Sequence, residues 1–238
     1  MGTGSVSARG QRRGVVRDSV GVAVATGLYG ASFGAVAVGS GLTVAQTCAL
    51  SLLMFTGASQ FALVGVVGAG GAPLAGTAAA LLLGARNTLY GLRLAPLLGW
   101  RGWRRAAAAQ VLIDESTAMA VNRPDRELAR VGFLTTGVGI LVLWNAFTLL
   151  GALAGEAIGD PRNFGLDAAV GAAFLALLWP RLREPGHARI ALLAATLAAL
   201  AVPFTPAGLP VLLAGGVAIL VGALLAGRAH TPPPEVAP

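Results

Sequence analysis

Long apolar stretches separated by short polar segments make up most of the chain. Seven of them cover residues 18–40, 43–68, 74–98, 131–158, 165–179, 188–202 and 209–226, and a weaker one covers residues 106–121. A helix needs about 20 predominantly apolar residues to cross the hydrocarbon core of a bilayer. The pattern therefore predicts an all-α membrane protein, a polytopic helical bundle of six to eight spans embedded in a lipid bilayer.

The two ends of the chain differ from this apolar region. Residues 1–17 contain four arginines and no apolar core, so we expect a disordered basic cytoplasmic tail rather than a cleaved signal peptide. Residues 228–238 include three consecutive prolines and are expected to form a disordered Pro-rich tail. The transmembrane domain is therefore predicted to span residues 18–227.

The second apolar run is interrupted by Gly57-Ala58-Ser59-Gln60. A break in a membrane helix exposes N–H groups that attract an anion and carbonyl groups that attract a cation. We therefore predict a broken or re-entrant helix near Gly57, with Gly57, Ser59 and Gln60 as substrate-binding residues. In the alternative interpretation, Gly57 only allows close packing and Gln60 forms a hydrogen bond between helices.

The third run carries polar side chains near its middle, at Arg86 and Asn87, followed by Tyr90. An arginine at the centre of a spanning helix costs at least about 2.5 to 3.5 kcal/mol and normally faces the bundle interior or a wet cavity. Arg86 therefore needs an acid, a carbonyl group or a substrate carboxylate as its partner. Arg86, Asn87 and Tyr90 join the candidate substrate-binding residues.

Two adjacent acids, Asp114 and Glu115, lie in the weakly apolar run 106–121. They form either the exposed face of an interfacial helix or buried partners for Arg86 and Arg93. The second interpretation is favoured because an unpaired arginine in lipid is the more costly alternative. Both acids are therefore candidates for proton coupling or ion pairing. Asp167 is a third candidate, although a carboxylate in the first turn of a helix also acts as a cap.

Glycines recur at four-residue spacing in two of the apolar runs. Gly30 and Gly34 form one such ladder, and Gly151, Gly155 and Gly159 form another. Small residues at this spacing let the backbones of membrane helices approach closely. Each ladder precedes a break and a further apolar helix, which is a weak internal repeat of the kind common in secondary transporters.

The arginine clusters leave two topologies open. If every run crosses, including residues 106–121, there are eight spans, and the arginines of residues 101–105 face outward against the positive-inside rule. If residues 43–68 are re-entrant and residues 106–121 do not cross, six spans leave only Arg162 outside. The six-span topology agrees better with the positive-inside rule, and the eight-span topology agrees better with the lengths of the apolar runs.

The overall composition agrees with a membrane protein and excludes several other classes. The chain is 55% hydrophobic and 11% charged, with a mean hydropathy of +0.75. Its net charge is +7, but the arginines lie between apolar runs, as in cytoplasmic loops, so nucleic-acid binding is not expected. Cys48 has no disulfide partner in the chain, and the two histidines lack further ligands at metal-binding spacing. We therefore expect neither a metal nor a cofactor.

Several of these segments together resemble the AzlC family of branched-chain amino acid permeases. The resemblance covers the run from Ser51 to Phe61, residues 86–92, the Asp114-Glu115 pair and Leu166-Asp167. The family pattern Asn-x-Arg-His-x-x-Tyr-Gly is matched at residues 84–91 in its Arg, Tyr and Gly. Gly and Asn replace the first Asn and the His, which removes a group that titrates near neutral pH.

The resemblance implies a function and a partner. It implies the large subunit of a two-component exporter for valine, leucine, isoleucine and sometimes methionine, acting in the bacterial inner membrane with a small AzlD-type membrane subunit. An amino acid zwitterion needs an anion receptor, an ammonium receptor and an apolar pocket. Arg86 or the helix start near Gly57 is expected to bind the carboxylate, and Asp114, Glu115 or Gln60 the ammonium group. Trp144 is expected to contact the side chain, together with Phe55 and Phe61.

The expected protein is therefore a proton-coupled secondary transporter and not an enzyme. Two rival hypotheses are a scaffold subunit that transports nothing and a transporter of another small solute. An intramembrane enzyme is a weaker rival, because the sequence does not supply a nucleophile, a base and a metal together.

Overall fold

The computed structural model describes residues 8–121, 123–158 and 185–229, together with five positions between residues 175 and 183. These residues form helices and connecting turns, with no strand among them. The helices are α1 (Ala8–Leu28), α2 (Gly30–Gly39), α3 (Val44–Leu53), α4 (Ala58–Gly68), α5 (Pro73–Leu98), α6 (Gly102–Gln110), α7 (Asp114–Val121), α8 (Arg126–Ile158), α10 (Pro185–Ala201), the short 3₁₀ helix η2 (Val202–Phe204) and α11 (Leu209–Ala229).

Three described helices are long and apolar enough to cross a bilayer. They extend over Arg9–Gly39, Arg126–Ala157 and Gly186–Phe204, and shorter apolar helices occur at Val44–Leu53, Ala58–Gly68 and Leu209–Leu224. The first combines α1 and α2, which are separated only by a turn at Tyr29. An all-helical architecture with several apolar helices is therefore confirmed for the described part of the chain, and the count of six to eight spans stays a prediction.

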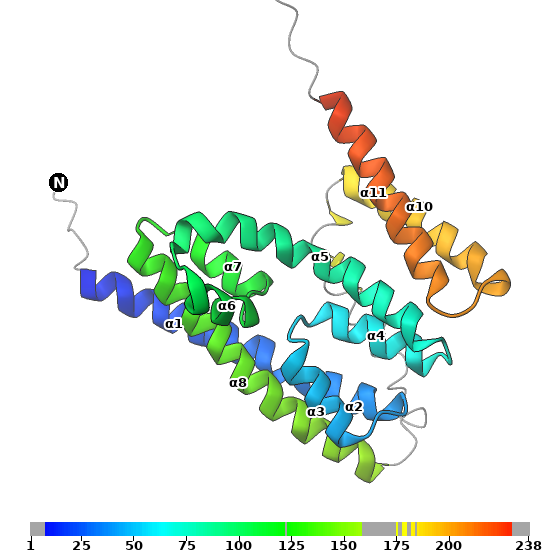
Figure 1. The fold of residues 1–238 in the computed structure, drawn as a ribbon, viewed down its shortest axis with the longest axis horizontal. Coiled ribbons are helices and arrows are strands. Elements are labelled where there is room, and N and C mark those ends of the chain that lie inside the picture. The colour runs from blue at the N-terminus through cyan, green and yellow to red at the C-terminus, as the bar shows by residue number, and fades with distance from the viewer. Residues whose placement is uncertain are drawn as a thin grey trace, which may run out of the picture.

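The centre of the bundle is the packing of α1 and α2 along α8 (Figure 1). A Cβ atom added to Gly30 would meet the Trp144 backbone, and one added to Gly34 would meet the Thr148 backbone. A Cβ on Gly151 would in turn meet the Ala31 backbone. The two predicted glycine ladders therefore pack against each other. The residue numbers of the contacting positions increase together along α2 and along α8, so α1, α2 and α8 run in the same direction.

Helix α5 runs in the opposite direction beside this pair. The Arg130 Nε donates to the Leu98 carbonyl at 2.8 Å, and Arg126 Nη2 donates to the Pro96 carbonyl at 3.4 Å. Trp100 packs on Phe133 with ring centroids 5.9 Å apart. The C-terminal end of α5 therefore lies where α8 begins. The two arginines donate hydrogen bonds to carbonyl groups that the end of a helix leaves without partners.

Helices α3 and α4 form a re-entrant hairpin, as predicted for one of the two topologies. The chain leaves helical geometry after Leu53 and resumes it at Ala58, with Gly57 at a φ of +61°. A Cβ on Gly68, at the end of α4, would lie 2.6 Å from the Ser40 Oγ atom, just after α2. The hairpin therefore begins and ends at the same end of the bundle. The predicted break near Gly57 is confirmed.

Helices α6 and α7 form a second hairpin that enters from the opposite end. Along α8, Met119 lies against Gly132, and Val111 lies deeper, against Gly137. At the tip, the Gln110 Nε2 donates to the Leu52 carbonyl at the end of α3, at 2.7 Å. The tips of the two hairpins thus meet inside the bundle. Residues 106–121 do not form the single helix that an eight-span topology requires, because the chain turns at Val111–Ile113.

Some predicted boundaries were wrong. The first helix begins at Ala8, so residues 8–17, expected to be a disordered tail, are helical. The α8 helix begins at Arg126, five residues before the start of the predicted apolar run at residue 131. Helix α11 continues to Ala229. Residues 1–7 and 230–238 and Asp167, with the helix predicted around it, lie outside the described residues.

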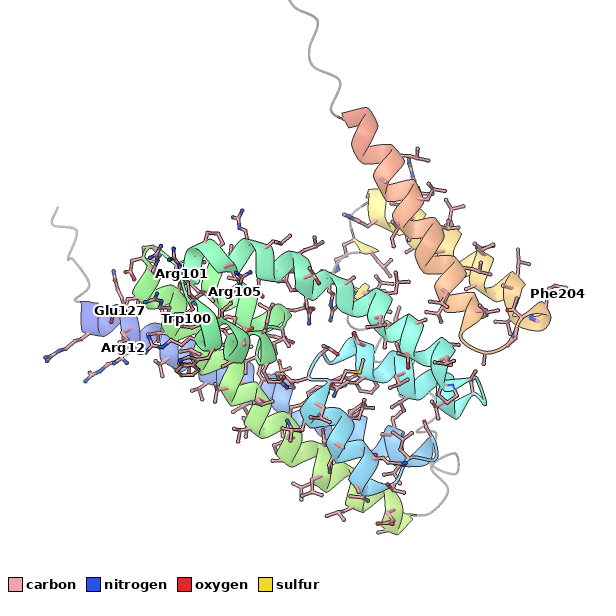
Figure 2. The ribbon with its side chains drawn as sticks, in the orientation of Figure 1. Arg12, Trp100, Arg101, Arg105, Glu127 and Phe204 are labelled. Carbon is pink, nitrogen blue, oxygen red and sulfur yellow. The ribbon has the colours of Figure 1, made fainter. Side chains whose placement is uncertain are left out.

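Many charged side chains of the described residues lie at one end of the bundle (Figure 2). Arg12 on α1, Arg101 and Arg105 around α6, and Glu127 at the start of α8 lie toward this end, and Phe204 lies at the opposite side of the molecule. Ten arginines share this end, namely Arg9, Arg12, Arg13, Arg17, Arg101, Arg104, Arg105, Arg123, Arg126 and Arg130. By the positive-inside rule, this end is expected to face the cytoplasm.

The contact between the glycine ladders makes a first prediction. Replacing Gly34 with Leu places a side chain where the backbones of Thr148 and Ala152 now lie, and overpacking of this kind typically costs about 1 to 3 kcal/mol or more. We expect lower membrane abundance and a melting temperature lower by on the order of 5 °C in detergent. Gly21→Leu is the control, because nothing lies within 4 Å of a Cβ there. Equal stability of both variants would contradict the packing described.

Candidate functional site

A cavity of about 390 Å³ lies where the two hairpin tips meet the long helices. We call it the central cavity. Its lining comes from the turn between α1 and α2, the break between α3 and α4, the middle of α5, the start of α7 and the middle of α8: Ala25, Thr26, Tyr29, Phe55, Thr56, Gly57, Ala58, Phe61, Arg86, Ile113, Asp114, Glu115, Ile140 and Trp144. The structure thus brings together five of the candidates chosen from sequence: Gly57, Arg86, Asp114, Glu115 and Trp144.

An ion pair crosses this cavity. The Arg86 Nη1 atom on α5 lies 3.3 Å from the Asp114 Oδ2 atom at the start of α7, and the two side chains are 33% and 38% exposed. The prediction that Asp114 is a partner for Arg86 is confirmed. Arg93 is exposed and forms no ion pair within the described residues. The pair fixes the tip of the α6–α7 hairpin against α5.

Four buried polar atoms around the central cavity have no hydrogen-bond partner among the described residues. They are the Tyr29 hydroxyl, the Trp144 indole nitrogen, the Arg86 Nε and the Asp114 Oδ1. More than nine in ten buried polar groups in proteins are paired, and leaving one unpaired costs about 1 to 3 kcal/mol. Three N–H or O–H donors and one carboxylate oxygen on residues that line this cavity therefore lack a partner within the described part of the chain.

Aromatic rings form one wall of the central cavity. The Tyr29 ring centroid lies 5.5 Å from that of Phe61 and 6.1 Å from that of Trp144. Phe33 packs behind them, 5.3 Å from Phe61 and 6.1 Å from Trp144. Interlocked rings of this kind move little, because each one blocks the rotation of the next. The wall is therefore a rigid, mostly apolar surface with two polar atoms.

Tyr29 was not among the residues chosen from the sequence. It lies at the turn between α1 and α2 and contributes both a ring and a hydroxyl to the cavity. The available signal was a lone tyrosine beside Gly27 and Gly30 within an otherwise apolar run. Gly30 was assigned to close helix packing, and no role was predicted for Tyr29.

Gln60 lies outside the central cavity and holds the helix break together. It is fully buried. Its Oε1 accepts a hydrogen bond from the Gly57 N–H, and its Nε2 donates to the Leu50 carbonyl, both at 3.2 Å. These bonds join the end of α3 to the start of α4. These bonds favour the alternative, in which the Gln60 amide is a structural link, and direct substrate binding by Gln60 stays a prediction.

Ser59 and Asn87 line a second, larger cavity of about 850 Å³ along α5. The Asn87 Nδ2 donates to the Leu112 carbonyl at 3.2 Å and so ties α5 to the tip of the second hairpin. Tyr90 lines neither cavity. Phe55 and Thr56, in the break between α3 and α4, line both cavities. The helix break therefore separates the two spaces.

The titratable groups of the site do not form a metal centre. Within the described residues, no group of three His, Cys, Asp or Glu side chains lies close enough together to hold a metal ion. Glu115 lines the central cavity but forms no ion pair within that part of the chain. The site therefore combines one paired carboxylate, one carboxylate without an arginine partner and several neutral donors.

Comparison with known proteins agrees with this architecture. A family model described as AzlC protein matches residues 21–158. The chain belongs to the AzlC family. The AzlC match includes every residue that lines the central cavity and ends before α10 and α11.

Curated relatives are membrane proteins. One from Helicobacter pylori is 26% identical over 154 residues, which are 63% of this chain and 66% of the relative. One from Archaeoglobus fulgidus is 31% identical over 154 residues, 64% of this chain and 67% of the relative. Both are named "Uncharacterized membrane protein". The chain spans about two thirds of the length of these relatives. No solved structure matches the chain.

The role of Gln60 makes a second prediction. Gln60→Leu leaves the Gly57 N–H and the Leu50 carbonyl without their amide partner, which should lower the free energy of unfolding by about 1 to 3 kcal/mol. The control is Gln46→Leu. Gln46 makes a similar hydrogen bond to the Thr43 N–H at the exposed start of α3. Thermal unfolding in detergent should show the larger loss for Gln60→Leu, and equal losses would contradict the structural role.

Proposed function

We propose that this AzlC-family protein is a secondary transporter that exports branched-chain amino acids across the bacterial inner membrane. The observation that carries the proposal is the central cavity, in which unpartnered donors and a carboxylate oxygen lie beside an apolar aromatic wall. A zwitterion with an aliphatic side chain needs all three kinds of surface at once.

The donors and the acids of the cavity match the two charged ends of an amino acid. The Tyr29 hydroxyl, the Trp144 N–H and the Arg86 Nε–H have no hydrogen-bond partner within the described residues and suit a carboxylate. The N-terminal end of α4 at Gly57 adds the favourable end of a helix dipole. The Asp114 Oδ1 is the unpartnered acceptor for the ammonium group, and the Glu115 carboxylate lines the same space.

The remaining lining suits an aliphatic side chain. Phe55, Phe61, Ile113 and Ile140 surround the space, and each is buried in the bundle. The volume of about 390 Å³ lies in the range of small-ligand sites. Apolar walls discriminate weakly between side chains that differ by one methylene, by about 1 to 3 kcal/mol. Valine, leucine, isoleucine and methionine therefore form a natural substrate group for one pocket.

The arrangement of the hairpins supports alternating access. The two re-entrant hairpins enter from opposite ends, and their tips meet at the cavity. Broken helices at a central site are the common plan of secondary transporters. We propose that movement around Phe55 and Thr56, which line both cavities, opens the site to one side at a time.

The proposed partner is a small AzlD-type membrane subunit, as the family resemblance implies, and the proposed driving force is a proton gradient. The rival scaffold hypothesis required the glycine ladders to be surfaces for other proteins. Gly30, Gly34 and Gly151 instead pack inside the chain, between α2 and α8, so this observation favours the transporter.

The test is export of labelled valine from loaded proteoliposomes, with this chain alone and with its small partner. We expect saturable export that unlabelled leucine and isoleucine inhibit. Export of neither valine nor leucine under any condition would contradict the proposal.

The ion pair makes a third prediction within the same assay. The double variant Arg86→Gln and Asp114→Asn should remain folded, since no charge loses its partner, yet export should fall by at least about tenfold because both ends of the substrate lose a receptor. Each single variant should be less stable than the double variant, because one partly buried charge loses its ion-pair partner. Arg93→Gln, on the exposed side of the same helix, is the control and should leave export unchanged. Normal export by the double variant would favour a scaffold.

A further inference from the structure

Coupling of export to protons requires a group whose charge differs between the loaded and the empty cavity. Two carboxyl groups line the central cavity, those of Asp114 and Glu115. They are adjacent in the sequence but differ in their partners. This inference rests on the proposed function, and it concerns which of the two carries the proton.

Asp114 is a poor proton carrier because it already neutralises Arg86. The two side chains form an ion pair at 3.3 Å. Protonation of Asp114 would remove the carboxylate that pairs directly with the Arg86 guanidinium, and breaking an ion pair from one side is unfavourable. Asp114 is therefore expected to stay ionised throughout the transport cycle.

Glu115 lies in the same cavity without an arginine of its own. The charged and titratable groups that face it are Arg86 from α5, Asp114 from α7 and Tyr29 from the turn between α1 and α2. Helix α8 supplies Ile140 and Trp144 at this level, and neither is charged. Arg86 balances only one of the two carboxylates. An ionised Glu115 therefore leaves one negative charge in the cavity, which a proton or an ammonium group removes.

We propose that Glu115 is the proton-coupling residue, and that its carboxylate holds either a proton or the ammonium group of the substrate. When a substrate enters from the cytoplasm, its ammonium group replaces the proton, which passes to cytoplasmic water. When the substrate leaves on the other side, the carboxylate takes a proton from the water there. One proton then enters for each amino acid that leaves, and no covalent bond is made or broken.

The first test measures protons released on binding. Valine is added to the purified, weakly buffered protein, and the change in pH is followed with a dye. The wild-type protein should release about one proton per valine bound, and Glu115→Gln should release none. Glu115→Asp keeps a carboxyl group and should still release protons. Valine binding to the wild-type protein without proton release would overturn the inference, whatever the variants do.

The second test separates coupling from transport in proteoliposomes. In Glu115→Gln, valine should still exchange for valine without a pH gradient, more slowly by about tenfold, because the amide oxygen is a weaker acceptor for an ammonium group. A pH gradient should no longer drive valine above its equilibrium level. Coupled export by Glu115→Gln equal to that of the wild type would overturn this inference alone. No valine exchange by the wild type would overturn the proposed function itself.

Discussion

The ion pair between Arg86 and Asp114 is the contact around which the site is built. An arginine in the middle of a membrane helix needs a counter-ion, because lipid cannot solvate it. Arg86 obtains one from the start of α7, so the α6–α7 hairpin must reach into the bundle as far as the middle of α5. The same requirement places Glu115 in the central cavity. The need of Arg86 for a counter-ion therefore fixes the position of the α6–α7 hairpin and places charged side chains in the lining of the central cavity.

The second constraint is the close contact of α2 with α8. Gly34 and Gly151 have no side chain, so the two backbones approach until a Cβ atom no longer fits. This contact brings Tyr29 and Trp144 within ring-contact distance, and both residues line the same cavity as the ion pair. The close glycine packing and the ion pair thus lie beside the same cavity. We propose that this cavity binds an amino acid, which has two charges and an apolar side chain.

Much of this arrangement was predictable from the sequence, where single residues carry strong physical demands. The cost of Arg86 in lipid predicted its partner, and the polar interruption at Gly57 predicted the break between α3 and α4. Other features were not. Gln60 is indistinguishable in sequence from a binding residue, and only its bonds to Gly57 and Leu50 reveal a structural role. Tyr29 reaches the site because α1 ends one residue before it, and no local sequence pattern predicts that turn. The basic segment of residues 8–17 continues the first helix back to Ala8 because helix formation depends on the neighbouring turns as well as on apolar content.

The most direct measurement of the central claim asks whether valine occupies the central cavity. Thr26 lines that cavity and is replaced with Cys in a Cys48→Ser background, so that it is the only thiol in the chain. Its rate of alkylation by a small maleimide is measured with and without valine, with Gly21→Cys on an open face of α1 as the control. The account predicts that valine slows alkylation at residue 26 and leaves residue 21 unaffected. Unchanged alkylation at residue 26, at valine concentrations that saturate export, would show that the substrate binds elsewhere.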